Sequence, residues 1–119
     1  MIVLETELVL EKGDFQQIKT KMTEFNKSRS EKQPLEFPSA GSTFKRPEGY
    51  FAGKLVMDAG LRGYTVGGAM VSEKHCGFVV NKGSATAKDV ITLMEDVKNI
   101  VNDKFGVILE PEVRIIGEF

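Results

Sequence analysis

The amino-acid sequence predicts an α+β fold, in which two or three helices pack against an antiparallel sheet. Two segments repeat apolar residues at intervals of three and four, as amphipathic helices do, and several short apolar runs lie beside glycines, as strands do. No internal repeat or low-complexity tract interrupts them. With 119 residues and 41% hydrophobic content, the chain has the size of one ordinary domain, so we expect a single domain over residues 1–119.

The first quarter of the chain predicts a strand followed by a helix. Residues 2–10 are rich in Val, Leu and Ile without a helical period, which favours a strand. Asp14 and Gln17 then have the spacing of a capping box. One helical face follows at Phe15, Ile18, Met22 and Phe25. We expect this helix to weaken across the polar residues 26–33 and to end before Pro34, because the residue before a proline avoids helical geometry.

Residues 34–50 predict a long loop, because they contain three of the four prolines and two glycines. Phe37 and Phe44 are large apolar anchors, and they favour an ordered loop over a disordered one. A short helix should follow. Its face is formed by Phe51, Leu55 and Ala59. Gly60 is the expected end of this helix.

The next segments predict an antiparallel strand pair and a long helix. Thr65–Val71 and Cys76–Val80 are short apolar runs joined by the turn sequence SEKH. Thr86 and Asp89 repeat the capping pattern, and the helix should continue to Phe105–Gly106. The expected buried face of this helix consists of Val90, Leu93, Met94, Val97, Ile100 and Val101.

The last element alternates between apolar and charged residues over 107–117, which predicts a strand. The apolar side would carry Val107, Leu109, Val113 and Ile115, and the charged side Glu110, Glu112 and Arg114. Pro111 lacks an N–H group, so the strand should lie at a sheet edge or contain a bulge.

Composition excludes several classes of function. Sixteen basic and seventeen acidic side chains nearly cancel, so no overall field favours nucleic acid or an anionic membrane. The single cysteine, Cys76, cannot form an internal disulfide, and no Cys/His cluster offers a zinc site. The first thirteen residues lack the basic region and cleavage site of a signal peptide, and no run reaches transmembrane length. We therefore expect a cytoplasmic protein.

The segment AGSTFKRP is a candidate anion site. Gly41 would let a ligand approach the backbone, Ser42 offers a hydroxyl proton, and Lys45 and Arg46 could neutralise phosphate. A capped, solvated turn has the same composition, and the residues alone do not separate the two interpretations.

Two further groups of residues are candidates for a functional site, and each also has a non-functional interpretation. Glu110, Glu112 and Arg114 share one face of the predicted last strand, where clustered carboxylates could form an acid and Arg114 could hold one of them ionised. A solvated outer face would look the same. His75 is the only histidine, and a histidine in a turn is commonly an exposed polar residue.

Four segments in fixed order resemble the C-terminal region of the UDP-N-acetylenolpyruvoylglucosamine reductases: PLEFPSAGSTFKRP, GKLVMDAGLRGYTVGGAMVSEKH, GFVVNKGSATAKDV and FGVILEPEVRIIG. Together they cover most of the chain, and several motifs in order are more specific than any one of them. The resemblance implies a role in peptidoglycan precursor synthesis. In this family, reduced FAD delivers a hydride to the enolpyruvyl double bond of UDP-N-acetylglucosamine-enolpyruvate, giving UDP-N-acetylmuramate, and NADPH reduces the flavin again.

The resemblance also implies roles for single residues. The proton-donating serine of the family falls on Ser42, with Gly41 offering its backbone to the substrate, and the assisting glutamate falls on Glu112. Arg46 lies where relatives place a residue near the diphosphate, and His75 lies in a turn that faces the substrate. Lys45 is a further candidate for substrate binding.

The FAD-binding part of such an enzyme would precede this sequence, and residues 1–12 would be a strand leading in from it. The 119 residues would then be a substrate-binding domain that is inactive without the flavin-binding part, its partner in the same enzyme. The alternative is a non-catalytic nucleotide-sugar-binding or interaction module on the same scaffold.

Overall fold

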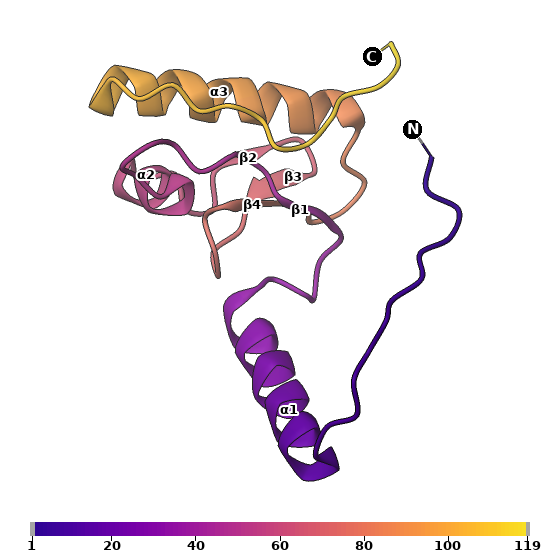
Figure 1. Cartoon of the computed structure of the whole chain (residues 1–119). Helices are drawn as coiled ribbons and strands as arrows, with labels where there is room; N and C mark the ends of the chain where they lie inside the picture. Colours follow the sequence, from indigo (N-terminus) through magenta and orange to yellow (C-terminus); the bar gives the residue numbers. More distant parts are fainter. Residues whose placement is uncertain (1, 119) are drawn as a thin grey trace. The chain divides into compact units, whose positions relative to one another are not determined.

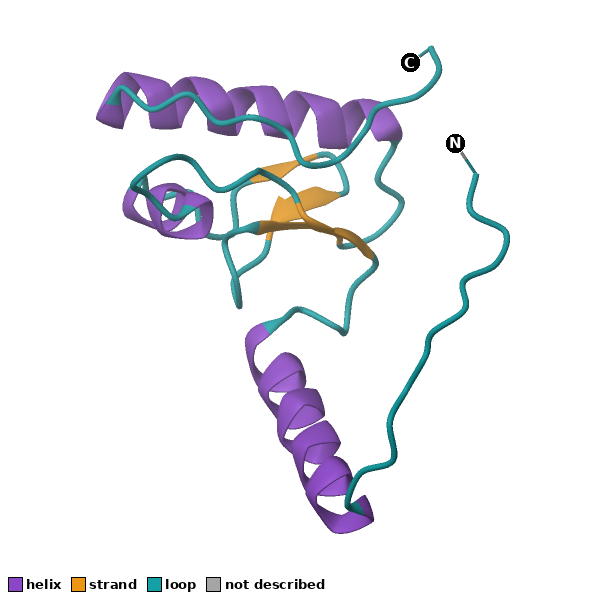
Figure 2. Cartoon of the chain, viewed as in Figure 1, coloured by secondary structure: helices purple, strands orange, loops and turns teal. Residues whose placement is uncertain are grey.

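The computed structural model describes residues 2–118, which fall into two units that meet in sequence between Glu31 and Lys32 (Figures 1 and 2). The first unit contains an extended segment and most of helix α1 (Phe15–Lys32). The second contains a four-stranded sheet and helices α2 (Ala52–Asp58) and α3 (Ala87–Phe105). Three helices and an antiparallel sheet in residues 2–118 confirm the predicted α+β class.

Helix α1 starts where the sequence predicts. The Asp14 carboxylate accepts a hydrogen bond from the Gln17 N–H at 2.8 Å, which caps the first turn. The helix does not weaken across residues 26–32 as expected, because that stretch contains neither glycine nor proline and an ion pair links Lys27 to Glu31. None of the side chains of α1 is buried, so its apolar face is open to solvent.

The strand predicted over residues 2–10 is not formed. Residues 2–14 have neither helical nor strand geometry, and their side chains are exposed. A strand is stabilised by backbone hydrogen bonds to a neighbouring strand, and the described residues provide none to this segment.

The sheet consists of β1 (Ser39–Ser42), β2 (Thr65–Val66), β3 (Ala69–Val71) and β4 (Phe78–Asn81) in the order β1-β4-β3-β2. All neighbouring strands are antiparallel. The predicted strand pair is confirmed as β3 and β4, but the run Thr65–Val71 is itself folded back at Gly67–Gly68 into two strands. Strand β1 lies within the segment that was predicted to be a loop, so that prediction is wrong for residues 39–42.

The core of the second unit lies between α2, α3 and the sheet, and Figure 1 shows α3 running along one side of the strands. Helix α3 buries Leu93, Met94, Val97 and Val101, as predicted. Helix α2 buries Ala52, Leu55 and Val56. Phe51 does not belong to that buried face, because it precedes the helix at the cap position and its side chain is 60% exposed. None of the helices in residues 2–118 has the length and apolar character needed to cross a membrane.

The ends of both helices follow the predicted signals. Gly60, with a φ of 80°, ends α2, and the Leu61 N–H returns to the Val56 carbonyl at 3.1 Å. Thr86 and Asp89 form a complete capping box at the start of α3, and Gly106 ends that helix in the left-handed conformation.

The strand predicted over residues 107–117 is reduced to one isolated bridge between Phe44 and Pro111. The Lys45 N–H donates to the Glu110 carbonyl and the Glu112 N–H to the Thr43 carbonyl, each at 2.9 Å. Pro111 cannot donate, and no further ladder forms on either side.

Only some of the alternating apolar residues of this segment are buried. Leu109 is completely buried, whereas Ile115 is 52% exposed. The segment is therefore held to the domain by the buried Leu109, by Val107 and Val113 packed partly against the core, and by one bridge in place of a continuous ladder.

Gly68 provides a test of how the hairpin joins α3. A Cβ atom at this position would lie 2.1 Å from the Gly83 carbonyl oxygen and 2.5 Å from the Ala85 nitrogen, and both are backbone atoms. We expect Gly68→Ala to lower the free energy of unfolding by at least about 2 kcal/mol, measured by urea denaturation. Gly49→Ala is the control, because its Cβ meets open space and only its φ of +76° costs energy, about 1 kcal/mol. Equal losses in the two variants would contradict this account of Gly68.

Asp89 makes the stability of α3 depend on pH. Its carboxylate accepts the Thr86 N–H at 2.9 Å, and this bond is the main cause that lowers the pKa of Asp89 below its ordinary value. A lowered pKa stabilises the fold above the pKa of the unfolded chain, and this contribution is lost as the pH falls through the folded value. We expect the difference in unfolding free energy between the wild type and Asp89→Asn to shrink as the pH falls from about 7 to about 3, measured by denaturation. A difference that stays constant would rule out this linkage.

Candidate functional site

A pocket of about 420 Å³ lies in the second unit where the end of β1, the loop after it, α2 and the turn before β4 meet. Ser42, Arg46 and His75, which are far apart in the sequence, all line it. Three further basic residues are part of its wall: Lys54, Arg62 and Lys74. The arrangement combines a hydroxyl, an imidazole and several cations, which suits an anionic ligand.

Ser42 is positioned by the pairing of β1 with β4, in which it lies opposite Phe78. The next residue anchors the backbone. The Thr43 N–H donates to the Gly77 carbonyl at 2.9 Å, and the buried Thr43 hydroxyl accepts the Val79 N–H at 2.9 Å. Gly41, just before Ser42, has a φ of +93° that strongly favours glycine, and no atom lies near the position of a Cβ there. The side of Gly41 where a Cβ would stand is therefore open, and its N–H donates to the Ser39 hydroxyl at 3.3 Å.

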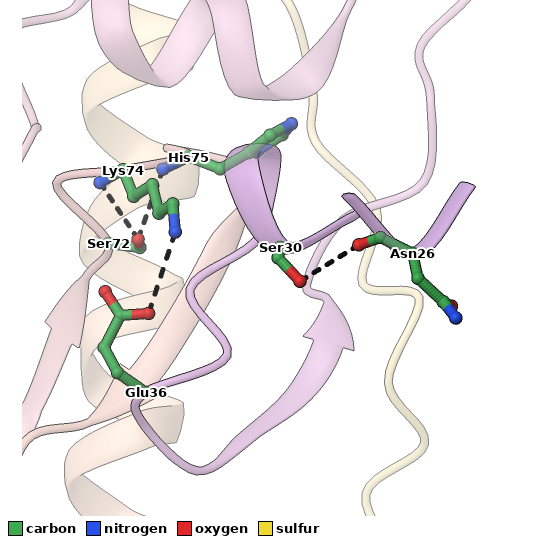
Figure 3. A network of polar contacts seen from close by, with 6 residues as sticks. All are labelled: Asn26, Ser30, Glu36, Ser72, Lys74 and His75. Carbon is green, nitrogen blue, oxygen red and sulfur yellow. Dashed lines mark hydrogen bonds and ion pairs between the residues drawn. The ribbon is translucent and has the colours of Figure 1, made fainter. Parts of the chain in front are cut away.

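His75 is fixed by its own turn. The hydroxyl of the buried Ser72 accepts the N–H groups of Lys74 and His75, both at 3.2 Å (Figure 3). The Gly77 N–H donates to Nδ1 of His75 at 3.0 Å, and the ring meets the edge of Phe78 with centroids 5.0 Å apart. With Nδ1 accepting, the neutral imidazole carries its hydrogen on Nε2, which is then a donor for a ligand.

Glycines make room for this imidazole. A Cβ at Gly77 would lie 2.9 Å from Cε1 of His75, and a Cβ at Gly53 would lie 3.2 Å from the same atom. A side chain at Gly77 would therefore crowd the His75 ring.

The basic residues of the pocket differ in how they are held. Lys54 is paired with Asp58 at 2.7 Å, and Lys74 lies 3.9 Å from Glu36 (Figure 3). Arg62 is instead held by neutral groups, because its guanidinium donates to the Glu73 carbonyl and contacts the Met57 sulfur at 3.2 Å. A carboxylate partner cancels much of a cation's charge, so the residues held by neutral groups present the stronger attraction to an anion.

The structure brings Lys45 and Glu112 to different places. Lys45 forms an ion pair with Glu110 at 3.2 Å and lines a neighbouring pocket of about 530 Å³, whose wall Arg46 shares. Glu112 is exposed and, within residues 2–118, is not part of the wall that Ser42 lines. Its backbone is nevertheless bonded to Thr43, the residue after Ser42.

The fold and this pocket define an α+β domain that offers a hydroxyl and several cations to an anionic ligand. The family model described as UDP-N-acetylenolpyruvoylglucosamine reductase, C-terminal domain, matches residues 33–116. The chain belongs to this family. The resemblance stated from the sequence motifs is thereby confirmed.

Individual relatives of the chain support the same family assignment. The chain is 69% identical to the UDP-N-acetylenolpyruvoylglucosamine reductase of Lachnoclostridium phytofermentans and 66% identical to that of Agathobacter rectalis, over 98% and 99% of its length. It is similar to the crystal structure of the same reductase from Thermus caldophilus, with a TM-score of 0.73 and 38% identity over 87% of the chain. In these three cases it spans only 37%, 38% and 36% of the relative.

The sequence patterns did not indicate a ligand site at Phe51, Lys54 or Arg62, although all three residues line the pocket. Phe51 was assigned to the buried helical face, and the two cations had no distinguishing pattern. A phenylalanine immediately before a helix, where a capping side chain is usual, is the one signal that could have drawn attention to this wall.

Cys76 gives a chemical probe of the pocket that it lines. Burial is the main cause that raises the pKa of this thiol, and it outweighs the opposing effect of Arg62. Because a higher pKa leaves less thiolate, we expect Cys76 to react with a disulfide reagent more slowly than a cysteine peptide does, and the rate to rise at a more alkaline pH. Spectrophotometric labelling rates measure this. A rate and pH profile equal to those of the peptide would contradict the burial of the thiol.

Proposed function

We propose that this domain binds UDP-N-acetylglucosamine-enolpyruvate and supplies the proton that completes its reduction to UDP-N-acetylmuramate, a step of peptidoglycan precursor synthesis. The chain belongs to the reductase family, and the observation that carries the proposal is the single pocket lined by Ser42, Arg46 and His75. These residues combine a proton donor with groups that attract a phosphorylated, carboxylated substrate.

The chemistry sets two requirements at the reacting carbons. Addition of a hydride to one carbon of the enolpyruvyl double bond breaks the π bond and leaves an electron pair on the other carbon, beside the substrate carboxylate. A proton must then be added at that second carbon, and the developing charge must be stabilised in place. We assign the proton to the Ser42 hydroxyl. Because a serine hydroxyl is a weak acid, positive charge in the same pocket would stabilise the alkoxide left behind.

Glu112 is assigned an assisting role in this protonation. Its support is the hydrogen bond from its N–H to the carbonyl of Thr43, which keeps the residue near the segment that carries Ser42. The Glu112 carboxylate would assist proton transfer from Ser42 from outside the pocket wall, once the substrate and the rest of the enzyme enclose the site.

The remaining assignments concern binding. Arg46 would contact the diphosphate, His75 would donate from Nε2 to a substrate oxygen, and Lys45 would add charge from the adjoining pocket. Gly41 would offer its backbone, since the space around it is open.

In the complete reaction, reduced FAD would supply the hydride and NADPH would reduce the oxidised flavin again. We assign neither cofactor to residues of this chain, whose basic pocket suits the substrate. These 119 residues alone are therefore proposed to bind substrate without turnover, as the substrate-binding part of a cytoplasmic enzyme. The single cysteine agrees with a reducing compartment.

Titration of the isotope-labelled chain with UDP-N-acetylglucosamine-enolpyruvate tests the binding step. Amide signals of the segments around Ser42, Arg46 and His75 are expected to shift together in NMR spectra. Unchanged spectra at millimolar ligand would refute a preformed site.

Ser42→Ala tests the catalytic step when the chain replaces the matching part of the Lachnoclostridium phytofermentans reductase. Oxidation of the reduced flavin by substrate should slow by roughly 10²- to 10⁴-fold, because the proton donor is lost, while flavin reduction by NADPH is unchanged. Stopped-flow absorbance separates the two half-reactions. Thr92→Ala, which removes an exposed hydroxyl of α3 outside the pocket, is the control and should leave both rates near those of the parent.

Equal slowing of both half-reactions by Ser42→Ala would argue against the proton-donor role. Substrate binding by the chain, combined with no turnover in the chimera, would favour the alternative of a non-catalytic nucleotide-sugar-binding module.

A further inference from the structure

Arg46 is held at the mouth of the pocket by two neutral groups. Its guanidinium carbon lies 4.0 Å from the centroid of the Phe51 ring, and its Nε donates to the Tyr50 carbonyl at 3.3 Å. No carboxylate pairs with Arg46 among the residues that the structure describes. Both terminal nitrogens of the guanidinium are therefore left for a ligand.

Two neighbouring lysines differ from Arg46, because each is paired with a carboxylate. Lys45 is paired with Glu110 and Lys54 with Asp58, so each has a carboxylate that neutralises part of its charge. An aromatic ring and a carbonyl fix the direction of a guanidinium without adding a negative charge. Arg46 thus combines a fixed orientation with a full positive charge, which is what bidentate binding of a phosphate group needs.

A tight turn brings the two anchors back to Arg46. The Tyr50 N–H donates to the Pro47 carbonyl at 3.1 Å, and Gly49 has a φ of +76°, which this turn requires of its third residue. The turn places the Tyr50 carbonyl and the Phe51 ring beside the side chain that precedes Pro47.

Phe51 is also an unusual residue for the cap position of a helix, where a capping side chain is preferred. It is the cap residue of α2, with extended geometry at φ −114° and ψ 120°, and it makes no capping hydrogen bond. Serine, threonine, aspartate and asparagine are strongly preferred there, and the 60% exposed phenylalanine forgoes both a cap and full burial. Such local departures occur where function requires them, and here the ring lines the candidate pocket.

We propose that Phe51 is a positioning residue, whose ring holds the Arg46 guanidinium in the orientation that receives the diphosphate of the nucleotide sugar. The identity of this ligand rests on the proposed function. The anion-binding arrangement itself rests on the contacts of Arg46.

The test compares three single variants of the chain by isothermal titration with two ligands, UDP-N-acetylglucosamine-enolpyruvate and inorganic pyrophosphate. Phe51→Leu keeps an apolar side chain but removes the ring face, and it should weaken both ligands by about two- to fivefold. Phe51→Trp keeps a ring face and should bind like the wild type or more tightly. Phe25→Leu removes another exposed phenylalanine, which lies on α1 outside this pocket and the adjoining one and serves as the control with unchanged affinity.

A double-mutant cycle with Arg46→Ala shows whether Phe51 acts through the arginine. The loss caused by Phe51→Leu should disappear in the Arg46→Ala background, because no guanidinium remains to be oriented. An equal loss in both backgrounds would overturn the proposal, since it would mean that the ring contacts the ligand or the fold directly. NMR spectra of each variant establish that the fold is retained.

The two ligands separate this inference from the proposed function. Binding of pyrophosphate that depends on Phe51, without binding of the nucleotide sugar, would leave the inference standing and remove the proposed function. Nucleotide-sugar binding that does not depend on Phe51 would do the reverse. Binding of neither ligand by the wild type would overturn both.

Discussion

The candidate site depends on the backbone pairing between residues 43–45 and residues 110–112. The hydrogen bonds from Lys45 to Glu110 and from Glu112 to Thr43 join two segments that are far apart in the sequence, and the burial of Leu109 holds the later segment against the core. The pairing of β1 with β4 holds Ser42 from one side, and this bridge ties the residues that follow it to the C-terminal segment. The place of the C-terminal segment beside the pocket is thus set by this bridge.

The sequence predicted the elements whose signals are local. Helix α3 has its cap at Thr86, its periodic apolar face and its terminating glycine in consecutive residues, and each was confirmed. Elements that depend on a distant partner were predicted poorly. Strand β1 has a sequence, SAGS, with little strand preference, and it exists because β4 pairs with it. Residues 2–10 and 107–117 have strong strand patterns, but the first lacks a partner among the described residues and the second has only a bridge through Pro111.

The pocket was predictable to the extent that its motifs are family motifs. Composition alone left Ser42 and Arg46 open between an anion site and an ordinary turn, and the resemblance to the reductases implied their particular roles. The structure places both with His75 on one wall, an arrangement that sequence distance could not indicate. The spacing of Phe51 fits the apolar face of α2, whereas in the structure its ring lies against the guanidinium of Arg46. Side-chain partners of this kind are decided by the course of a turn, which single-residue preferences do not specify.

The anchors of Arg46 all lie within residues 46–51. Because the turn, the ring and the carbonyl are encoded side by side, the contacts that orient this guanidinium are all local in the sequence. The segment RPEGYF is in this sense a portable unit. Grafted onto an unrelated scaffold between a strand and a short helix, it would carry its own means of aiming an arginine.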